Sequence, residues 1–330
     1  MPARFSARRL TGRAIPIVAA LGAIVLVVEL APGLGGVRDH LRDATPGWIV
    51  LAIALEVASC VSYVLMFRPV FCNRIQRRLS AEIGFSELAV GSIVPASGAG
   101  GLALGAWVLR RRGMSGERIA RRSVAFFLIK SSVNFVAVAI LGVLMAAGVF
   151  GPNLSLALTA LPAALSIGLI ATVIVVPRFG PGADLRPGAG RLRRAMNASR
   201  RWLVQGTGEA IALVRSRDMT LVFGAVGYWA FDNAVLWTTY HAVGGGPPLS
   251  IVLMGYLIGQ LGGLLPLPGG VGGIDGGLIG TLVVYGAAAT PTAAAVLAYR
   301  LILFWVPLAI GIPAFVLLSR RLRHDEAVVS

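Results

Sequence analysis

Residues 265–278 read LPLPGGVGGIDGGL, and this stretch decides the fold. Its two prolines and six glycines break a helix, yet it lies inside an apolar run, 250–286, that is long enough to enter a bilayer. Irregular backbone at membrane depth is tolerated only where it is buried in protein or lines a wet cavity. The stretch therefore predicts a broken, re-entrant helix in a membrane protein.

The composition of the whole chain agrees with a membrane protein. Of 330 residues, 56% are hydrophobic and only 13% are charged, whereas a soluble domain has about 25% charged residues. The net charge of +16 comes from arginines spread between apolar runs, so it indicates anionic lipid headgroups as partners and excludes nucleic acid. The membrane-length runs are 14–32, 46–67, 87–109, 123–149, 154–176, 219–243, 250–286 and 292–318.

Arginine-rich flanks decide which runs cross the membrane. Run 87–109 has arginines on both sides, which the positive-inside rule does not allow for a simple span. Its centre reads PASGAGG, residues 95–101, and breaks a helix. We therefore expect this run to dip in from the cytoplasm and return. The nine arginines between 178 and 217 mark a cytoplasmic loop, part of which (roughly 190–217) is expected to form a basic amphipathic helix on the membrane surface.

The two broken runs align without gaps at an offset of 172 residues, and four glycines coincide. Because they enter from opposite faces, the alignment predicts an inverted-topology repeat; close helix packing by abundant glycine is the alternative explanation. The expected fold is an all-α polytopic membrane protein with about six transmembrane helices plus two re-entrant broken helices. The re-entrant turns are assigned to Pro95, Gly98, Gly100, Gly101, Pro268, Gly269, Gly270, Gly272 and Gly273.

Five regions follow from this topology. The first, 1–45, holds an N-terminal span and a loop, and the second, 46–149, is the first repeat. The other three are a linking span with the basic loop (150–218), the second repeat (219–318) and a tail (319–330). Arginines flank both ends of the chain, so both termini are expected in the cytoplasm of a bacterium, beside the inner membrane.

Ionisable residues inside the spans cost about 2.5–3.5 kcal/mol each and are candidates for a functional site. Lys130, the only lysine, and Arg300 would hold a lipid phosphate, while the acids would hold a cationic group or act as gates. At the same offset of 172, each half supplies an acid before its broken segment and a base after it. The alternative is a set of structural ion pairs. The full candidate set is Glu56, Lys130, Asn134, Asp232, Asn233, Gln260, Asp275, Tyr299 and Arg300.

An enzymatic function is not expected. The three histidines lie at surfaces or in the tail. Cys60 lies in an apolar run and Cys72 in a basic stretch, so a disulfide between them is not expected. The sequence shows no Walker-type loop and no metal-ligating cluster, so neither a cofactor nor a metal is expected. Transport would then be downhill or coupled to an ion.

Three segments resemble the lysylphosphatidylglycerol synthase transmembrane-region family: LPLPGGVGGIDGGL at 265–278, AYRLILFWVP at 298–307, and Pro95 to Gly101 followed by LRRRG at 109–113. The family often has Glu where this chain has Asp275. The resemblance covers most of the chain and implies the flippase half of multiple peptide resistance factor proteins. It also implies a homodimer.

Few residues follow the last span, so we expect lipid translocation and not lipid synthesis. The cargo would be an aminoacylated phospholipid, another anionic phospholipid or a polyprenyl phosphate. Two alternatives remain: a membrane subunit of a lipid-modifying system whose enzyme is a separate chain, and a scaffold that transports nothing.

Overall fold

The structure is a computed structural model that describes Gly22 and residues 35–72, 75–93, 99–180, 190–259 and 273–329. These residues form eleven α-helices and one short 3-10 helix, with no β-strand among them. The elements are α2 (Gly35–Arg42), α3 (Pro46–Phe71), α4 (Arg77–Ile93), α5 (Ala99–Arg111), α6 (Gly116–Ala146), α7 (Leu156–Val175), η3 (Val176–Phe179), α8 (Arg191–Arg215), α9 (Met219–Ala242), α10 (Leu249–Gly259), α11 (Gly273–Val284) and α12 (Ala289–Val329).

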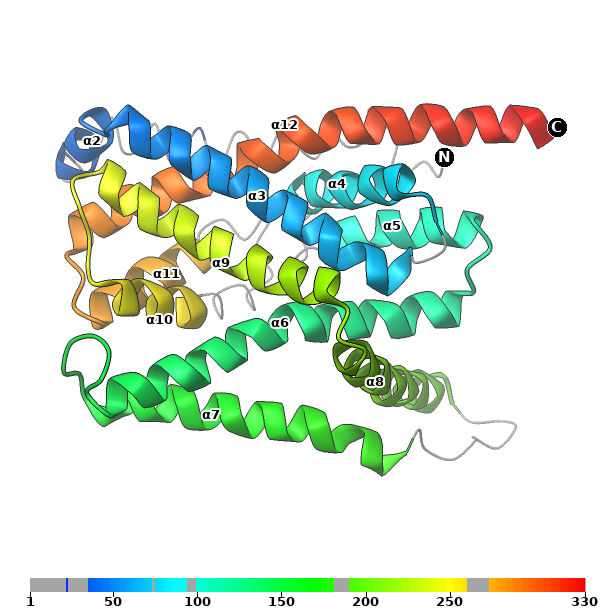
Figure 1. Cartoon of the computed structure of the whole chain (residues 1–330), viewed down its shortest axis with the longest axis horizontal. Helices are drawn as coiled ribbons and strands as arrows, with labels where there is room; N and C mark the ends of the chain where they lie inside the picture. The colour runs from blue at the N-terminus through cyan, green and yellow to red at the C-terminus, as the bar shows by residue number, and fades with distance from the viewer. Residues whose placement is uncertain are drawn as a thin grey trace.

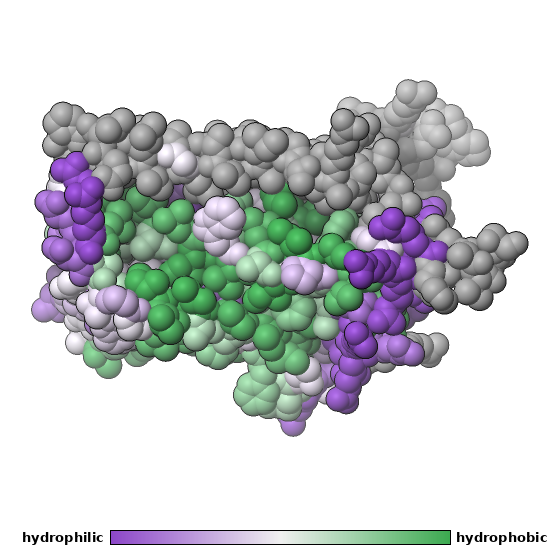
Figure 2. Space-filling view, turned by 90° about the horizontal axis from the view of Figure 1, so that it is seen from above, coloured by the Kyte–Doolittle hydropathy of each residue, from purple (hydrophilic) through white to green (hydrophobic). Residues whose placement is uncertain are grey.

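Five helices are long and apolar enough to cross a membrane: α3, α6, α7, α9 and α12. They correspond to five of the six predicted spans. The sixth, 14–32, lies outside the described residues apart from Gly22. Figure 2 shows apolar side chains over the middle of one face, with hydrophilic side chains gathered at its two ends, as expected where lipid tails surround the middle of a protein.

Several helices begin earlier or end later than hydropathy predicts. Helix α6 begins at Gly116, because the Ser115 hydroxyl accepts a hydrogen bond of 3.3 Å from the Arg118 N–H. Helix α4 begins at Arg77, before the predicted start of the broken run at residue 87, and α12 continues beyond 318. The added helical turns are polar, so a hydropathy pattern does not detect them. A helix cap or a surface ion pair can stabilise such turns.

Helices α3 and α9 form the centre of the molecule and run in opposite directions (Figure 1). Glycines allow this close approach. A Cβ on Gly224 would lie 2.5 Å from the backbone nitrogen of Met66, and one on Gly227 would lie 2.7 Å from the Ser62 hydroxyl. Larger residues would force the two central helices apart.

Two pairs of short helices lie at opposite ends of this centre (Figure 1). In the first pair, a Cβ on Gly101 of α5 would lie 2.2 Å from the Glu87 carbonyl oxygen of α4. In the second pair, a Cβ on Gly259 of α10 would lie 2.6 Å from the Cα of Leu278 on α11. Each pair is therefore held by glycine contacts, and both pairs are too short for either helix to cross a bilayer alone.

The spanning helices are seen from the side in Figure 1, whereas helix α8 is seen almost end-on. It is the predicted helix of the basic loop, and it packs on α6, since a Cβ on Gly206 would lie 2.6 Å from the Val124 side chain. Glu209 fixes it further by pairing with Arg122 at 2.6 Å and Arg121 at 3.4 Å. The helix thus lies across the span direction at the arginine-rich end.

Candidate functional site

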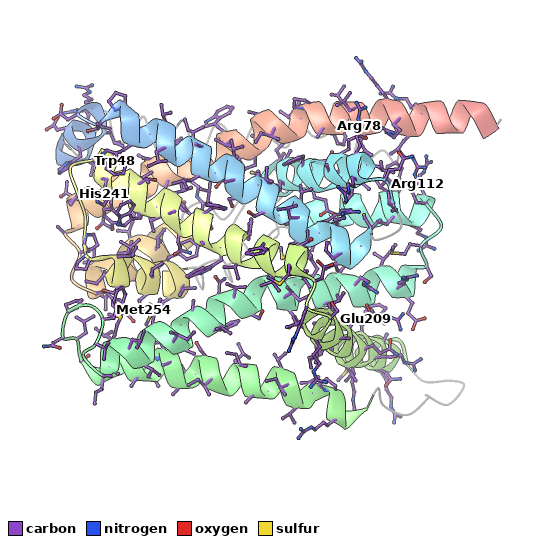
Figure 3. All side chains as sticks on the ribbon, viewed as in Figure 1. Trp48, Arg78, Arg112, Glu209, His241 and Met254 are labelled. Atoms are coloured by element: carbon purple, nitrogen blue, oxygen red, sulfur yellow. The ribbon has the colours of Figure 1, made fainter. Side chains whose placement is uncertain are left out.

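The two ends of the spanning region are marked by different side chains (Figure 3). At one end Trp48 packs against Trp237 and His241, with ring centroids 5.8 and 4.9 Å away. At the other lie Arg78, Arg112 and Glu209. Glu56 is two turns beyond Trp48 along α3, or about 12 Å. The predicted charged residues therefore fall between an aromatic end and a basic end.

Asp232 of α9 is the centre of the charged group. It is 7% exposed, and two hydroxyl groups donate to its carboxylate: Tyr256 of α10 to Oδ2, and Tyr299 of α12 to Oδ1 at 3.1 Å. Asp232 also interacts electrostatically with Lys130 and Arg300. Side chains from α6, α9, α10 and α12 therefore meet at this carboxylate.

Glu56 of α3 lies beside Asp232 and interacts with it electrostatically. Its side chain is buried, and its nearest polar contact is the Cys60 thiol, 3.7 Å from Oε1. The other oxygen, Oε2, has no hydrogen-bond partner among the described residues. A buried carboxyl group with so little compensation is costly, which makes Glu56 the least satisfied acid of the group.

Lys130 lies on α6, near the middle of that helix, and is partly buried. Its ammonium lies 5.8 Å from the centroid of the Tyr228 ring. Across the described part of the chain it has no hydrogen bond and no ion pair. The only lysine of the protein is thus held near an acid and an aromatic ring, and no described residue accepts a hydrogen bond from its three N–H donors.

Arg300 behaves differently, because it is already paired. Its Nε donates to Asp275 Oδ1 of α11 at 2.6 Å, and the two side chains are 15% and 18% exposed. The pair ties α12 to the second short-helix pair. We call Glu56, Lys130, Asp232, Asp275 and Arg300, with Tyr228, Tyr256 and Tyr299, the polar cluster.

The remaining predicted site residues are less well supported. Asn233 is buried, but its amide donates to the Trp229 carbonyl oxygen of its own helix at 2.8 Å, and Oδ1 has no partner among the described residues. Asn134 is partly buried one turn beyond Lys130, and the structure records no hydrogen bond for it.

Most of the predicted turn residues, and Gln260, fall where the structure gives no description. Those outside the described residues are Pro95, Gly98, Gln260, Pro268, Gly269, Gly270 and Gly272. Gly100 and Gly101 lie in the first turn of α5, and Gly273 begins α11, so these three belong to helices that follow the breaks.

Sequence reasoning missed Glu87 and the tyrosines of the cluster apart from Tyr299. Glu87 of α4 is buried, and the Tyr63 hydroxyl donates to its Oε2 at 2.9 Å. Tyr63 and Glu87 are 24 residues apart, and so are Asp232 and Tyr256. This repeated spacing of a tyrosine and an acid, with their order reversed, was a signal available in the sequence.

The family comparison covers the same elements. The model of the family described as lysylphosphatidylglycerol synthase TM region matches residues 14–311, which include every member of the polar cluster. The chain belongs to this family. Together with the five apolar spans, the match establishes a multi-pass membrane protein of the lysylphosphatidylglycerol synthase transmembrane-region family.

Two similar proteins are both called "UPF0104 membrane protein" and come from Methanothermobacter thermautotrophicus. One is 23% identical over 329 residues, which cover 90% of this chain and 92% of that protein. The other is 34% identical over 101 residues, covering 30% of this chain and 29% of that protein. The similarity therefore extends over nearly the whole length of the first relative.

Proposed function

We propose that the protein moves a lipid with an anionic phosphate headgroup across the membrane. The observation that supports this most is Lys130: its ammonium lies inside the spanning region and has neither a hydrogen bond nor an ion pair among the described residues. Ionisable groups are expensive there and are retained for function. A phosphate oxygen is an acceptor suited to a compact ammonium.

An inverted repeat would explain how the polar cluster is built. Helices α3 to α6 would correspond to α9 to α12, with the short pairs α4–α5 and α10–α11 as re-entrant elements from opposite faces. The offset of 172 fits the glycines of α5 and α11, while an offset of 169 relates Tyr63 to Asp232 and Glu87 to Tyr256. Transporters of this type bind substrate near the midplane, where the two repeats meet.

The two cations of the cluster have proposed roles in phosphate binding. Lys130 would bind the phosphate first, because no described side chain forms a hydrogen bond or an ion pair with it. Arg300 would join while it keeps its contact to Asp275, because one guanidinium can bind two acceptors. Asn233 Oδ1 and Trp229 Nε1, which have no hydrogen-bond partner among the described residues, offer further polar contacts for a headgroup.

The charges at the two ends suggest an orientation. Arginines gather at the end that carries Arg78 and Arg112, whereas α2 at the other end balances Arg38 and Arg42 with acids nearby. Positive loops stay in the cytoplasm, so the end with α8 would be cytoplasmic, and both termini with it. Helix α8 would then contact the anionic headgroups of the inner leaflet.

A second function is favoured by the family description itself, which names the membrane region of a synthase. In that case the protein would be the membrane subunit of a lipid-modifying system and would receive an aminoacylated lipid from a separate enzyme. The two functions share the same binding site and differ in the lipid that is bound.

Lipid translocation in proteoliposomes tests the proposal. Headgroup-labelled phosphatidylglycerol, a lysylated analogue and a polyprenyl phosphate would be compared in vesicles with wild type, Lys130→Ala or Arg300→Ala at matched protein content. We expect the wild type to move one of these lipids and both variants to lose that activity.

Each alternative result has a distinct meaning. Movement of the lysylated lipid alone would favour coupling to a lipid-modifying enzyme. Vesicles with wild type that behave like empty vesicles for all three lipids would contradict translocation by this chain alone. Full activity in Lys130→Ala would place the binding site elsewhere.

A further inference from the structure

Glu56 is a buried acid that the phosphate-binding function leaves unexplained. Its side chain is 5% exposed, and Oε2 has no hydrogen-bond donor among the described residues. Among the described residues, the carboxyl receives one weak hydrogen bond, from the Cys60 thiol, 3.7 Å from Oε1. If Glu56 were ionised, its buried charge would have too few hydrogen bonds and no described cation beside it to offset the loss of hydration. A protonated, neutral carboxyl avoids this desolvation penalty.

The contacts between α3 and α9 place Glu56 opposite Asp232. On one side of it, the Ser59 hydroxyl donates to the Tyr228 carbonyl oxygen at 3.4 Å, and on the other, Trp48 packs on Trp237. Counted from these two contacts along the antiparallel helices, residues 229 to 231 lie level with Glu56, so Asp232 lies within one turn of it and interacts with it electrostatically. Two carboxyl groups that share a low-dielectric site cannot both ionise without a large penalty, so one of them retains a proton.

The surroundings decide which acid is ionised. Asp232 accepts hydrogen bonds from Tyr256 and Tyr299 and interacts with the cations Lys130 and Arg300. Among the described residues, the other titratable groups that interact with Glu56 are Cys60 on its own helix, Tyr228 of α9 and Tyr299 of α12. None of these three is a cation. The proton therefore belongs on Glu56 and the negative charge on Asp232.

We propose that Glu56 and Asp232 form a proton-binding site and that a proton travels with each anionic lipid. This inference rests on the proposed function. When a phosphate binds Lys130, the phosphate takes over the attraction that Asp232 had from that ammonium. Glu56 already holds one proton, so the proton that the pair then takes up from water binds a carboxylate oxygen of Asp232 and offsets the added negative charge. Because linkage is reciprocal, protonation of the pair favours phosphate binding to the same degree.

A pH gradient across proteoliposomes tests this coupling. Headgroup-labelled phosphatidylglycerol starts equally distributed between the leaflets, and the membrane potential is clamped at zero. Symport predicts that the labelled lipid accumulates in the leaflet on the alkaline side, by up to about tenfold per pH unit for one proton per lipid. Protein orientation does not affect this steady state, since the gradient alone sets it.

Three variants make the test specific. Asp232→Asn cannot take up the proton that follows the lipid, so any lipid that it moves should stay equally distributed with or without the gradient. Glu56→Gln replaces only the acid that stays protonated, so any lipid that it moves should still follow the gradient. Glu82→Gln is the matched control with the response of the wild type, because Glu82 is also a buried acid but pairs with Arg321 at 2.9 Å, away from the cluster. Infrared difference spectra of Glu56→Gln and Glu82→Gln should show a protonated carboxyl band lost only in Glu56→Gln.

The outcomes separate the coupling from the proposed function. Translocation by wild type without any response to the pH gradient would overturn the coupling and leave the function intact. A response to a sodium gradient instead of the pH gradient would overturn the proton as the ligand. An unchanged carboxyl band in Glu56→Gln would overturn the assignment of the proton. Absence of translocation under every condition would overturn the function and the coupling together.

Discussion

The two halves of the molecule each combine long apolar helices with a pair of short helices, but their charged residues are partnered differently. In the second half, Arg300 is paired with Asp275, and Asp232 accepts hydrogen bonds from two tyrosines. In the first half, Lys130 has no such partner among the described residues, and one oxygen of Glu56 is equally unsatisfied. Its acids Glu82 and Glu87, both on α4, are satisfied, because Glu82 accepts hydrogen bonds from Arg321 and Glu87 accepts one from Tyr63.

This difference teaches that similar helix arrangements do not imply similar roles. Ion pairs and tyrosine contacts fix the second half and contribute to its rigidity. The unpaired groups of the first half gain little from the folded structure and are therefore the ones that remain free to bind a ligand. We infer that ligand binding begins on the first half and that the second half responds to it.

The largest expected effect is the fall in lipid translocation when Lys130, in the first half, is replaced. Lys130→Ala removes a charge-assisted contact to phosphate, which is worth about 1.5–3 kcal/mol, so translocation should fall by about 10- to 100-fold. Its thermal unfolding midpoint in detergent should stay near that of the wild type, because Lys130 makes no ion pair with a described residue. A large loss of stability would show that Lys130 is structural.

The glycine contacts of the short pairs should give the next largest effect. Gly101→Ala places a Cβ 2.2 Å from the Glu87 carbonyl oxygen, and overpacking of this kind costs about 1–3 kcal/mol. Gly280→Ala on α11 is the matched control, since nothing lies within 4 Å of its Cβ. Thermal unfolding of both variants measures the difference. Equal midpoints would mean that α4 and α5 do not pack closely in the membrane.

The ion pair of the second half should matter mainly for stability. Arg300→Gln leaves Asp275 without that partner, and we expect a loss of about 1–2 kcal/mol, reduced from the fully buried case because both side chains are partly exposed. The double variant with Asp275→Asn should regain most of the midpoint but not the translocation rate. A double variant with full transport would remove Arg300 from the binding site.

The tyrosine contacts should give the smallest effects. Tyr63→Phe and Tyr256→Phe each remove one hydrogen bond to a buried acid, with a cost of about 1 kcal/mol in unfolding free energy. Only Tyr256→Phe should also slow translocation, because Asp232 belongs to the polar cluster. Equal slowing by both variants would contradict the different roles of the two halves.

Much of this arrangement could be predicted from sequence because hydropathy and arginine placement report directly on the membrane. Five of the spans follow from such patterns, and Lys130, Asp232, Tyr299 and Arg300, which the sequence places in one site, do lie together. The predicted turns at Pro95 and Pro268 lie outside the described residues. The sequence does not decide whether Arg300 pairs with Asp275 for structure or for binding, since both explanations predict such a pair.

The parts that could not be predicted depend on tertiary contacts. The polar start of α4 gives no apolar signal, yet Arg321 of α12 holds Glu82 there with two hydrogen bonds, of 2.9 and 3.1 Å. Tyr63 and Tyr256 each lie 24 residues from an acid, but this spacing alone does not establish a contact, which depends on how α4 and α10 pack. Hydropathy records the burial of a residue and not its partner.

A single lysine offers a direct measurement of the central claim, which is that Lys130 binds the lipid phosphate. Labelling with ε-15N-lysine gives one side-chain signal, because Lys130 is the only lysine in the chain. Solid-state NMR in phosphatidylglycerol proteoliposomes can then detect dipolar dephasing of this nitrogen by lipid 31P. We predict dephasing that corresponds to an ammonium in direct contact with phosphate. A signal unaffected by 31P, in vesicles shown to translocate the lipid, would contradict the assignment of Lys130 as the phosphate-binding residue.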